Sequence, residues 1–320
     1  MNNSFIGENY YVPENVLTVL KIRYHIIMPI LILMTFCTNS LTLSIARKMN
    51  SKKHLHVNTY IKLMIISELC FATTLIPTLI DTKFCIYNSY IFAFYQTFFV
   101  QPAPYYFRYI STSLMLNLSI DRFMVLWFPH RFETLKRFTK IRIIFIWVLV
   151  TLSIIPHFLL GKVLLDEREN KWISIRGYKN TDNPWLKPYK LYIIVSFVII
   201  PSVLITFLSI GMIIGIREKV LKSNIRNSIM NYTEQKKRQK SYTLAVLASN
   251  IFYVGCMVPF TFLVGTYKLE NGRCFSNKNQ ETIKSIAFCF LMAWVIFNQL
   301  VFFMIHRDYQ KPLKKIFCKK

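Results

Sequence analysis

The chain of 320 residues carries a formal net charge of +25 at pH 7, is 53% hydrophobic and 16% aromatic, and has only 17% charged residues. This composition is too apolar for an ordinary soluble domain and favours a membrane protein. In a soluble protein such a charge would suggest a nucleic-acid partner. Here the basic residues lie between long apolar runs and form no continuous face, so we expect no nucleic-acid binding.

Seven segments are long and apolar enough to cross about 30 Å of hydrocarbon as helices. They are residues 24–46, 57–80, 90–127, 141–160, 189–216, 242–267 and 282–305. The third is longer than one crossing needs, which predicts a tilted helix or one that continues into the cytoplasm. The predicted fold class is therefore all-α, with residues 1–320 forming a single seven-helix transmembrane bundle.

The distribution of basic residues predicts the orientation in the membrane. More than half of the 40 Lys and Arg residues fall in residues 47–53, 122–142, 217–240 and 307–320, which all lie on one side. Because short basic loops remain in the cytoplasm, the amino terminus is expected outside the cell, in a multi-pass protein of the plasma membrane. Asn2 then begins a glycosylation sequon on the outer side.

The carboxyl-terminal residues suggest contact with the inner membrane surface. In residues 308–318, Leu313, Ile316 and Phe317 share one helical face and lysines occupy the others, which predicts a short amphipathic helix on anionic lipid. Cys318 is a candidate for palmitoylation, and the alternative is a free cytosolic thiol.

Two charged residues, Glu68 and Arg108, lie near the middle of predicted spanning helices, far from the helix ends. A carboxylate in mid-membrane costs about 2.5 kcal/mol or more, so Glu68 favours a functional role. Arg108 is either a counter-charge for a ligand or the partner of a buried acidic or carbonyl group.

Each predicted helix carries a recognisable mark. In chain order these are Asn39, Glu68, Asp121-Arg122-Phe123, Trp147, Pro201, the run from Tyr253 through Cys256 and Met257 to Pro259, and Asn298 with Phe302 four residues on. The series resembles the signatures of rhodopsin-like G-protein-coupled receptors. Residues 117–123 and the fifth helix are similar in look to invertebrate FMRFamide-receptor-like neuropeptide receptors.

The resemblance implies a switch built on the third, sixth and seventh helices. Arg122 would be held by Asp121 at rest and would engage a heterotrimeric G protein on activation, with Phe123, Asn298 and Phe302 belonging to the same switch. The hinge of the sixth helix would comprise Tyr253, Cys256, Met257 and Pro259. These assignments imply a signalling receptor and no enzyme, cofactor or resident metal.

The resemblance also implies a polar core formed by Asn39, Glu68 and Ser111. Glu68, Ser111 and Asn298 stand where many such receptors hold sodium, although a protonated or water-bridged Glu68 is an equal alternative.

Several positions depart from the family pattern. Met257 replaces a tryptophan, and Phe302 and Ser209 replace two tyrosines. Gln239 offers no carboxylate to Arg122, so we expect the resting state to depend mainly on Asp121 and on packing.

The outer surface lacks the family's usual disulfide. Thr97 occupies the helix-three position, and residues 163–190 contain no cysteine. Cys85 and Cys274 are both expected outside, where they either form a substitute disulfide or remain free thiols.

Two residues disfavour amine and retinal ligands. Pro104 stands where amine receptors have an aspartate, and Met292 stands where light-sensing relatives have a lysine. Gln101, Tyr105 and Arg108 are the predicted ligand-binding residues, and a peptide with an anionic or amidated end suits them. The alternatives are a chemosensory receptor of the same fold for small molecules and, less favoured, a seven-helix channel or transporter.

Overall fold

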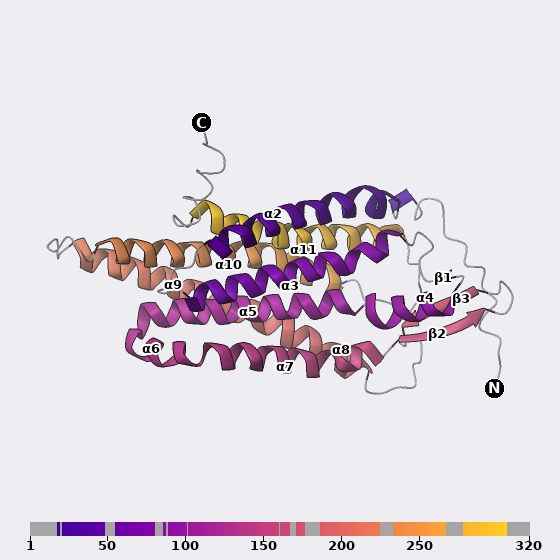
Figure 1. Ribbon diagram of the computed structural model, residues 1–320, viewed down its shortest axis with the longest axis horizontal. Helices are drawn as coiled ribbons and strands as arrows, with labels where there is room; N and C mark the ends of the chain where they lie inside the picture. The colour runs from indigo at the N-terminus through magenta and orange to yellow at the C-terminus, as the bar shows by residue number, and fades with distance from the viewer. Residues whose placement is uncertain are drawn as a thin grey trace.

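The computed structural model describes residues 18–19, 21–48, 55–80, 86–87, 89–100, 102–159, 161–166, 171–176, 186–224, 233–266 and 278–305. Seven long helices run roughly along the same axis (Figure 1). They are α2 (Met28–Lys48), α3 (Leu55–Ile80), α5 (Ala103–Trp127), α7 (Thr139–Leu159), α9 (Ile200–Asn224), α10 (Thr233–Thr266) and α11 (Lys278–Ile305). π-helical segments, Arg23–Ile27 and Val195–Ile199, precede α2 and α9, and α8 (Leu186–Ile194) leads into the second of them.

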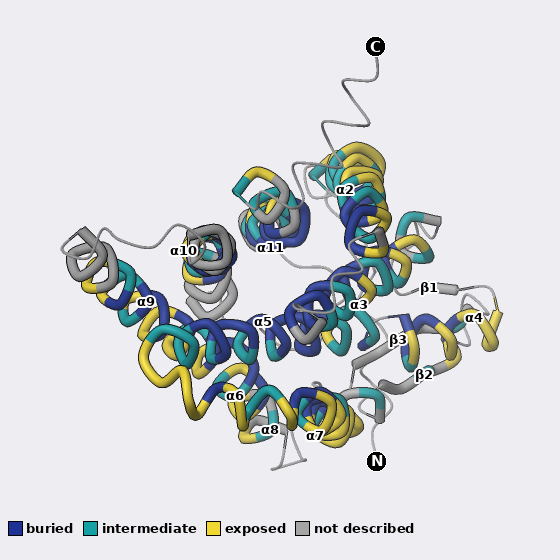
Figure 2. The backbone as a smooth tube through the Cα atoms, turned by 60° about the vertical axis from the view of Figure 1, so that its left-hand side comes forward, coloured by how far each residue is buried: buried dark blue, intermediate teal, exposed yellow. Residues whose placement is uncertain are grey.

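The helices pack in a closed ring. Following the contacts, α2 touches α3, α3 touches α5, α5 touches α9, α9 touches α10, α10 touches α11, and α11 returns to α2. Helix α7 packs on the outside of α5, and Figure 2 shows α5 between α3, α7 and α9. Helix α5 therefore contacts α3, α7, α9 and α10.

Apolar side chains lie on the outside of the bundle, and polar side chains lie in its interior. Within the described residues, five helical spans are long and apolar enough to cross a membrane: Arg23–Arg47, Val57–Pro77, Thr139–Pro156, Leu191–Glu218 and Lys240–Pro259. Helix α7 points large apolar side chains outward, such as Ile144 and Phe145, each 64% exposed. Helix α5 is the opposite, since it buries Arg108, Asp121 and Arg122. Lipid suits the outward apolar side chains, and polar side chains turn toward the interior of the bundle.

The predicted third helix, residues 90–127, is divided in the structure. Helix α4 (Tyr90–Tyr95) continues as a π-helical segment, Gln96–Val100, and a new helix, α5, begins at Ala103. Pro102 is the N-cap of α5, and Pro104 follows in its first turn. Because proline has no backbone N–H to donate, these two residues interrupt the helical hydrogen bonds and are tolerated at a helix start. The long predicted segment therefore consists of two helices in succession, and its length does not require a tilted helix.

A small antiparallel sheet, which the sequence analysis did not predict, joins two loops at one end of the bundle. Strands β2 (Gly161–Asp166) and β3 (Lys171–Arg176) form a hairpin between α7 and α8, and β1 (Ile86–Tyr87), between α3 and α4, pairs with β3. The register places Ile86 opposite Ile173 and Tyr87 opposite Trp172. The ring of Trp172 packs edge-on against Tyr90 with centroids 4.8 Å apart. Figure 1 shows the sheet beside α4.

At the opposite end, α5 is followed by α6 (Pro129–Arg137), a short helix that leads into α7 and buries Phe132. The predicted amphipathic helix at residues 308–318, with Cys318, lies outside the described residues. Asn2, Cys85 and Cys274 also lie outside them.

Candidate functional site

Glu68 organises a polar cluster in the middle of the bundle. It is 1% exposed on α3, and its Oε1 accepts hydrogen bonds from Ser111 Oγ of α5 at 3.2 Å and Asn298 Nδ2 of α11 at 3.3 Å. Ser249 Oγ of α10 donates to Asn298 Oδ1. Four helices therefore meet through one buried carboxyl group. Both donors reach the same oxygen, which fixes the orientation of the group whether or not its other oxygen is protonated.

The contacts of Glu68 are compatible with both alternatives for this cluster, a sodium ion or a protonated or water-bridged Glu68. Ser111 and Asn298 donate to one carboxyl oxygen, and the Ser111 hydroxyl oxygen keeps lone pairs that can bind a cation. Asn39, the third predicted member of the polar core, is fully buried on α2. Its side chain makes no hydrogen bond within the described part of the chain, so it stands apart from the cluster.

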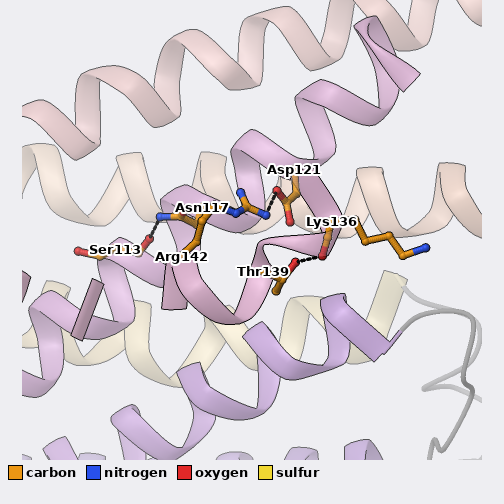
Figure 3. Close-up of polar contacts among 6 residues, drawn as sticks. All are labelled: Ser113, Asn117, Asp121, Lys136, Thr139 and Arg142. Atoms are coloured by element: carbon orange, nitrogen blue, oxygen red, sulfur yellow. Dashed lines mark hydrogen bonds and ion pairs between the residues drawn. The ribbon is translucent and has the colours of Figure 1, made fainter. Parts of the chain in front are cut away.

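Asp121 forms an ion pair that sequence reasoning missed. Its Oδ1 lies 2.7 Å from Arg142 Nη2, and Figure 3 shows the arginine reaching from α7 to α5. The Asp121 side chain is 0% exposed, whereas that of Arg142 is 20% exposed. The Arg142 guanidinium also lies 6.0 Å from the centre of the Tyr60 ring of α3. Asp121, expected to hold its neighbour Arg122, thus also ties α5 to α7.

Arg122 is 3% exposed and lies against an aromatic ring of α10. Its guanidinium carbon is 5.7 Å from the centre of the Tyr242 ring, and Tyr242 is fully buried. Asp121 adds an electrostatic interaction with the same arginine. A cation over an aromatic face is attracted by the ring quadrupole. Gln239 offers Arg122 no carboxylate. The aromatic ring of Tyr242, three residues further along α10, contacts Arg122 instead, which the sequence did not predict.

Phe123, the third residue of the Asp-Arg-Phe motif, packs against α9. A Cβ added to Gly211 would lie 2.5 Å from Cε2 of Phe123, so only glycine allows this approach. Trp127 Nε1 donates to the Gly211 carbonyl oxygen at 3.0 Å. Phe123 and Trp127 thus hold the end of α5 that leads into α6 close to α9.

The predicted hinge residues of α10 face the interior of the bundle. Tyr253, Cys256 and Met257 are buried. The Tyr253 ring meets Trp294 of α11 edge-on at 5.4 Å between centroids. Ser202 Oγ of α9 lies 3.5 Å from the Tyr253 hydroxyl. Trp294, where the family often has a polar residue, thus fills the space between α10 and α11.

Arg108 connects the predicted ligand side to the hinge. It is 5% exposed, and its Nη2 donates to Met257 Sδ at 3.3 Å. The phenol groups of Tyr105, Tyr109 and Tyr253 lie near its guanidinium. Tyr105 is 39% exposed and its ring is 6.4 Å from that of Tyr109. The structure therefore brings Arg108 near Tyr105. The third predicted ligand residue, Gln101, lies outside the described residues, as does the side chain of Phe302.

The model of the 7 transmembrane receptor (rhodopsin family) matches residues 38–302. No curated protein matches the sequence. The family match covers most of the chain and agrees with seven long helices around a buried polar interior. The chain belongs to the rhodopsin family of seven-transmembrane receptors. It is therefore a multi-pass membrane receptor and not an enzyme.

Proposed function

We propose that this receptor lies in the plasma membrane with its amino terminus outside, binds an extracellular peptide, and activates a heterotrimeric G protein through Arg122. The observation that carries the proposal is the burial of Arg122 at one end of α5, between Asp121 and the Tyr242 ring. An arginine near a membrane boundary is stable only with partners, and one with partners on two helices can change between them.

The same end of the bundle carries the positive charge expected of a cytoplasmic face. Helix α6 ends with Lys136 and Arg137, and Lys140 and Arg142 stand in the first turn of α7. Basic residues near the ends of spanning helices favour the cytoplasm. This supports the orientation in which Arg122 faces a G protein.

A peptide ligand is supported by the chemistry around Arg108. The guanidinium is buried among tyrosines, and Tyr105 remains partly exposed on the next turn of α5 toward the outer end. A buried arginine suits a carboxylate or the carbonyl oxygen of an amidated terminus, because it offers several N–H donors in a fixed plane. Phenol side chains add hydrogen bonds and aromatic surface. Its bond to Met257 joins this region to the predicted hinge.

The test is G-protein activation in cells that express the wild type, Arg122→Ala or Arg108→Gln, challenged with a neuropeptide library. Surface expression is matched between variants by antibody labelling. Arg47→Ala, an exposed arginine at the end of α2, is the control. We expect a peptide response that Arg122→Ala abolishes and Arg47→Ala preserves. Arg108→Gln should raise the half-maximal peptide concentration at least about tenfold, as the loss of a charged hydrogen bond requires.

Silence of well-expressed wild type to every peptide, together with a response to an odorant or another small molecule, would refute the peptide assignment. It would favour the chemosensory alternative. A peptide response that survives in Arg122→Ala would refute the role of Arg122 in coupling.

A further inference from the structure

Asn250 of α10 joins two other helices through buried hydrogen bonds. Ser119 Oγ of α5 donates to Asn250 Oδ1 at 2.9 Å, and Asn250 Nδ2 donates to Ser209 Oγ of α9 at 3.1 Å. Asn250 and Ser119 are fully buried, and Ser209 is 6% exposed. We call Ser119, Asn250 and Ser209 the polar junction.

The two serine hydroxyl groups of the polar junction also hydrogen-bond to the backbone of their own helices. Ser209 Oγ accepts a hydrogen bond from Asn250 Nδ2 and donates one to the Ile205 carbonyl oxygen at 2.6 Å. The single hydroxyl hydrogen of Ser119 is shared between two acceptors at 2.9 Å, the Met115 carbonyl oxygen and Asn250 Oδ1. Both ends of the amide are thus engaged in a region without bulk water, where an unpaired amide would be costly. The polar junction therefore fixes the spacing of α5, α9 and α10.

The preceding residue connects α10 in a different direction. Ser249 donates to Asn298, which donates to Glu68. Successive residues on a helix point about 100° apart, so Ser249 and Asn250 face different neighbours. The adjacent residues Ser249 and Asn250 therefore hold α10 on two sides. Asn250 bonds to α5 and α9, and Ser249 is linked through Asn298 of α11 to Glu68 of α3.

The backbone hydrogen bonding of α10 is interrupted a few residues after Asn250. Pro259 lies inside the helix and has no backbone N–H for the carbonyl of Gly255. Gly255 has no side chain, and a Cβ placed there would meet nothing within 4 Å. Glycine and proline are the usual places at which a helix bends. The part of α10 that precedes Gly255 can therefore move relative to the part that follows, and the polar junction lies on the moving part.

We infer that Asn250 is a positioning residue that holds the inner part of α10 against α5 and α9 in the resting receptor. Opening of the polar junction lets this part of α10 swing about residues 255–259 and frees the Arg122 side chain from Tyr242. The conformational part of the inference stands on the contacts of the described residues, and its link to signalling rests on the proposed function.

The first readout is a distance that needs no G protein. Spin labels are attached through an unnatural ketone-bearing amino acid at the exposed positions of Lys140 on α7 and Lys240 on α10, in receptor purified into lipid nanodiscs. Pulsed electron resonance then gives the distribution of distances between the two labels. Asn250→Leu, Ser209→Ala and Ser119→Ala are compared with Ile251→Ala, a lipid-facing neighbour that is 57% exposed.

We expect the population of the longer distance to rise about fivefold in Ser209→Ala and Ser119→Ala, which each remove one hydrogen bond, and about thirtyfold in Asn250→Leu, which removes two. Ser119→Thr keeps the hydroxyl and should restore the wild-type distribution. Combining Ser119→Ala with Asn250→Leu should add nothing, because both disrupt the same bond. Basal G-protein activation should rise in the same order.

An unchanged distance distribution in Asn250→Leu would overturn the inference, and so would a loss of thermal stability with no change in distance, which would mark the polar junction as structural only. A shifted distance without any change in G-protein activation would uphold the inference and count against the proposed coupling.

Discussion

Asp121 shows how a motif residue can acquire a partner that the motif does not contain. Its ion pair with Arg142 joins residues 21 positions apart on two helices, at an N–O distance of 2.7 Å. A carboxylate that is fully buried requires such a partner, because desolvation of an isolated charge costs several kcal/mol. Arg142 can supply it since its side chain keeps 20% exposure while the guanidinium points inward.

Arg142→Ala should destabilise the receptor, because it leaves the buried Asp121 without its ion-pair partner. We expect a loss of about 3 kcal/mol in the free energy of unfolding, the lower part of the range for breaking a buried pair. The measurement is the apparent melting temperature in detergent. Adding Asp121→Asn to Arg142→Ala should recover part of the loss.

Lys136→Ala provides the matched control. Its ion pair with Glu133, at 3.7 Å, is exposed on α6, so its loss should change stability by less than about 0.5 kcal/mol. Equal effects of Arg142→Ala and Lys136→Ala would show that the Asp121 pair is not a buried one.

At the scale of elements, the three-stranded sheet links two loops at one end of the bundle without a covalent bond. The chain lacks the helix-three cysteine at Thr97, yet β1 before α4 pairs with β3 after α7, next to the helix that contains Thr97. Backbone hydrogen bonds and the packing of Trp172 on Tyr90 therefore connect the segments that the usual disulfide would connect. Such a link is weaker than a disulfide, because it does not restrict the unfolded chain.

Trp172→Ala should loosen this sheet. The aromatic contact contributes about 0.5–1.5 kcal/mol beyond its buried area. Amide hydrogen exchange in β3 should therefore accelerate several-fold, as measured by mass spectrometry on purified receptor. Ile91→Ala, at a 78% exposed position of α4, is the control and should change exchange little. Unchanged exchange in Trp172→Ala would mean that strand pairing alone holds the loops.

At the scale of the whole molecule, polar side chains connect most of the helices. The Glu68 cluster joins α3, α5, α10 and α11, the polar junction adds α9, and the Asp121 ion pair adds α7. Apolar packing alone gives little preference for one rotation of a helix in lipid, because lipid tails are as apolar as the helix surfaces. Buried polar contacts supply that preference.

Glu68→Leu should lower the apparent melting temperature, whereas Glu68→Gln should preserve it. Glutamine keeps a carbonyl oxygen for Ser111 and Asn298, while leucine leaves both donors buried without an acceptor, at a cost of about 1–3 kcal/mol. Thr73→Ala, an exposed position on the same helix, controls for an effect of substitution in α3. A leucine variant more stable than the wild type would mean that burying the carboxyl group destabilises the receptor more than its hydrogen bonds stabilise it.

The sequence by itself determined the class of the protein. Hydropathy over each segment depends only on local residues, so long apolar runs and one motif residue per helix were sufficient to predict a bundle of rhodopsin-like type, which the family match confirms. The resemblance to this family also placed Glu68, Ser111 and Asn298 together, because each stands at a recognisable position in its own helix.

Only the tertiary structure decided which side chains meet across helices. The contacts of Asp121 with Arg142, Arg122 with Tyr242 and Ser119 with Asn250 depend on how each helix is rotated and how closely it approaches its neighbour. Hydropathy contains no information on rotation within a hydrophobic span. The division of the predicted third helix has a local cause, because Pro102 and Pro104 interrupt its hydrogen bonds and can be read from the sequence. The pairing of β1 with β3 belongs to the tertiary structure, since segments far apart in sequence supply the partners of the backbone groups.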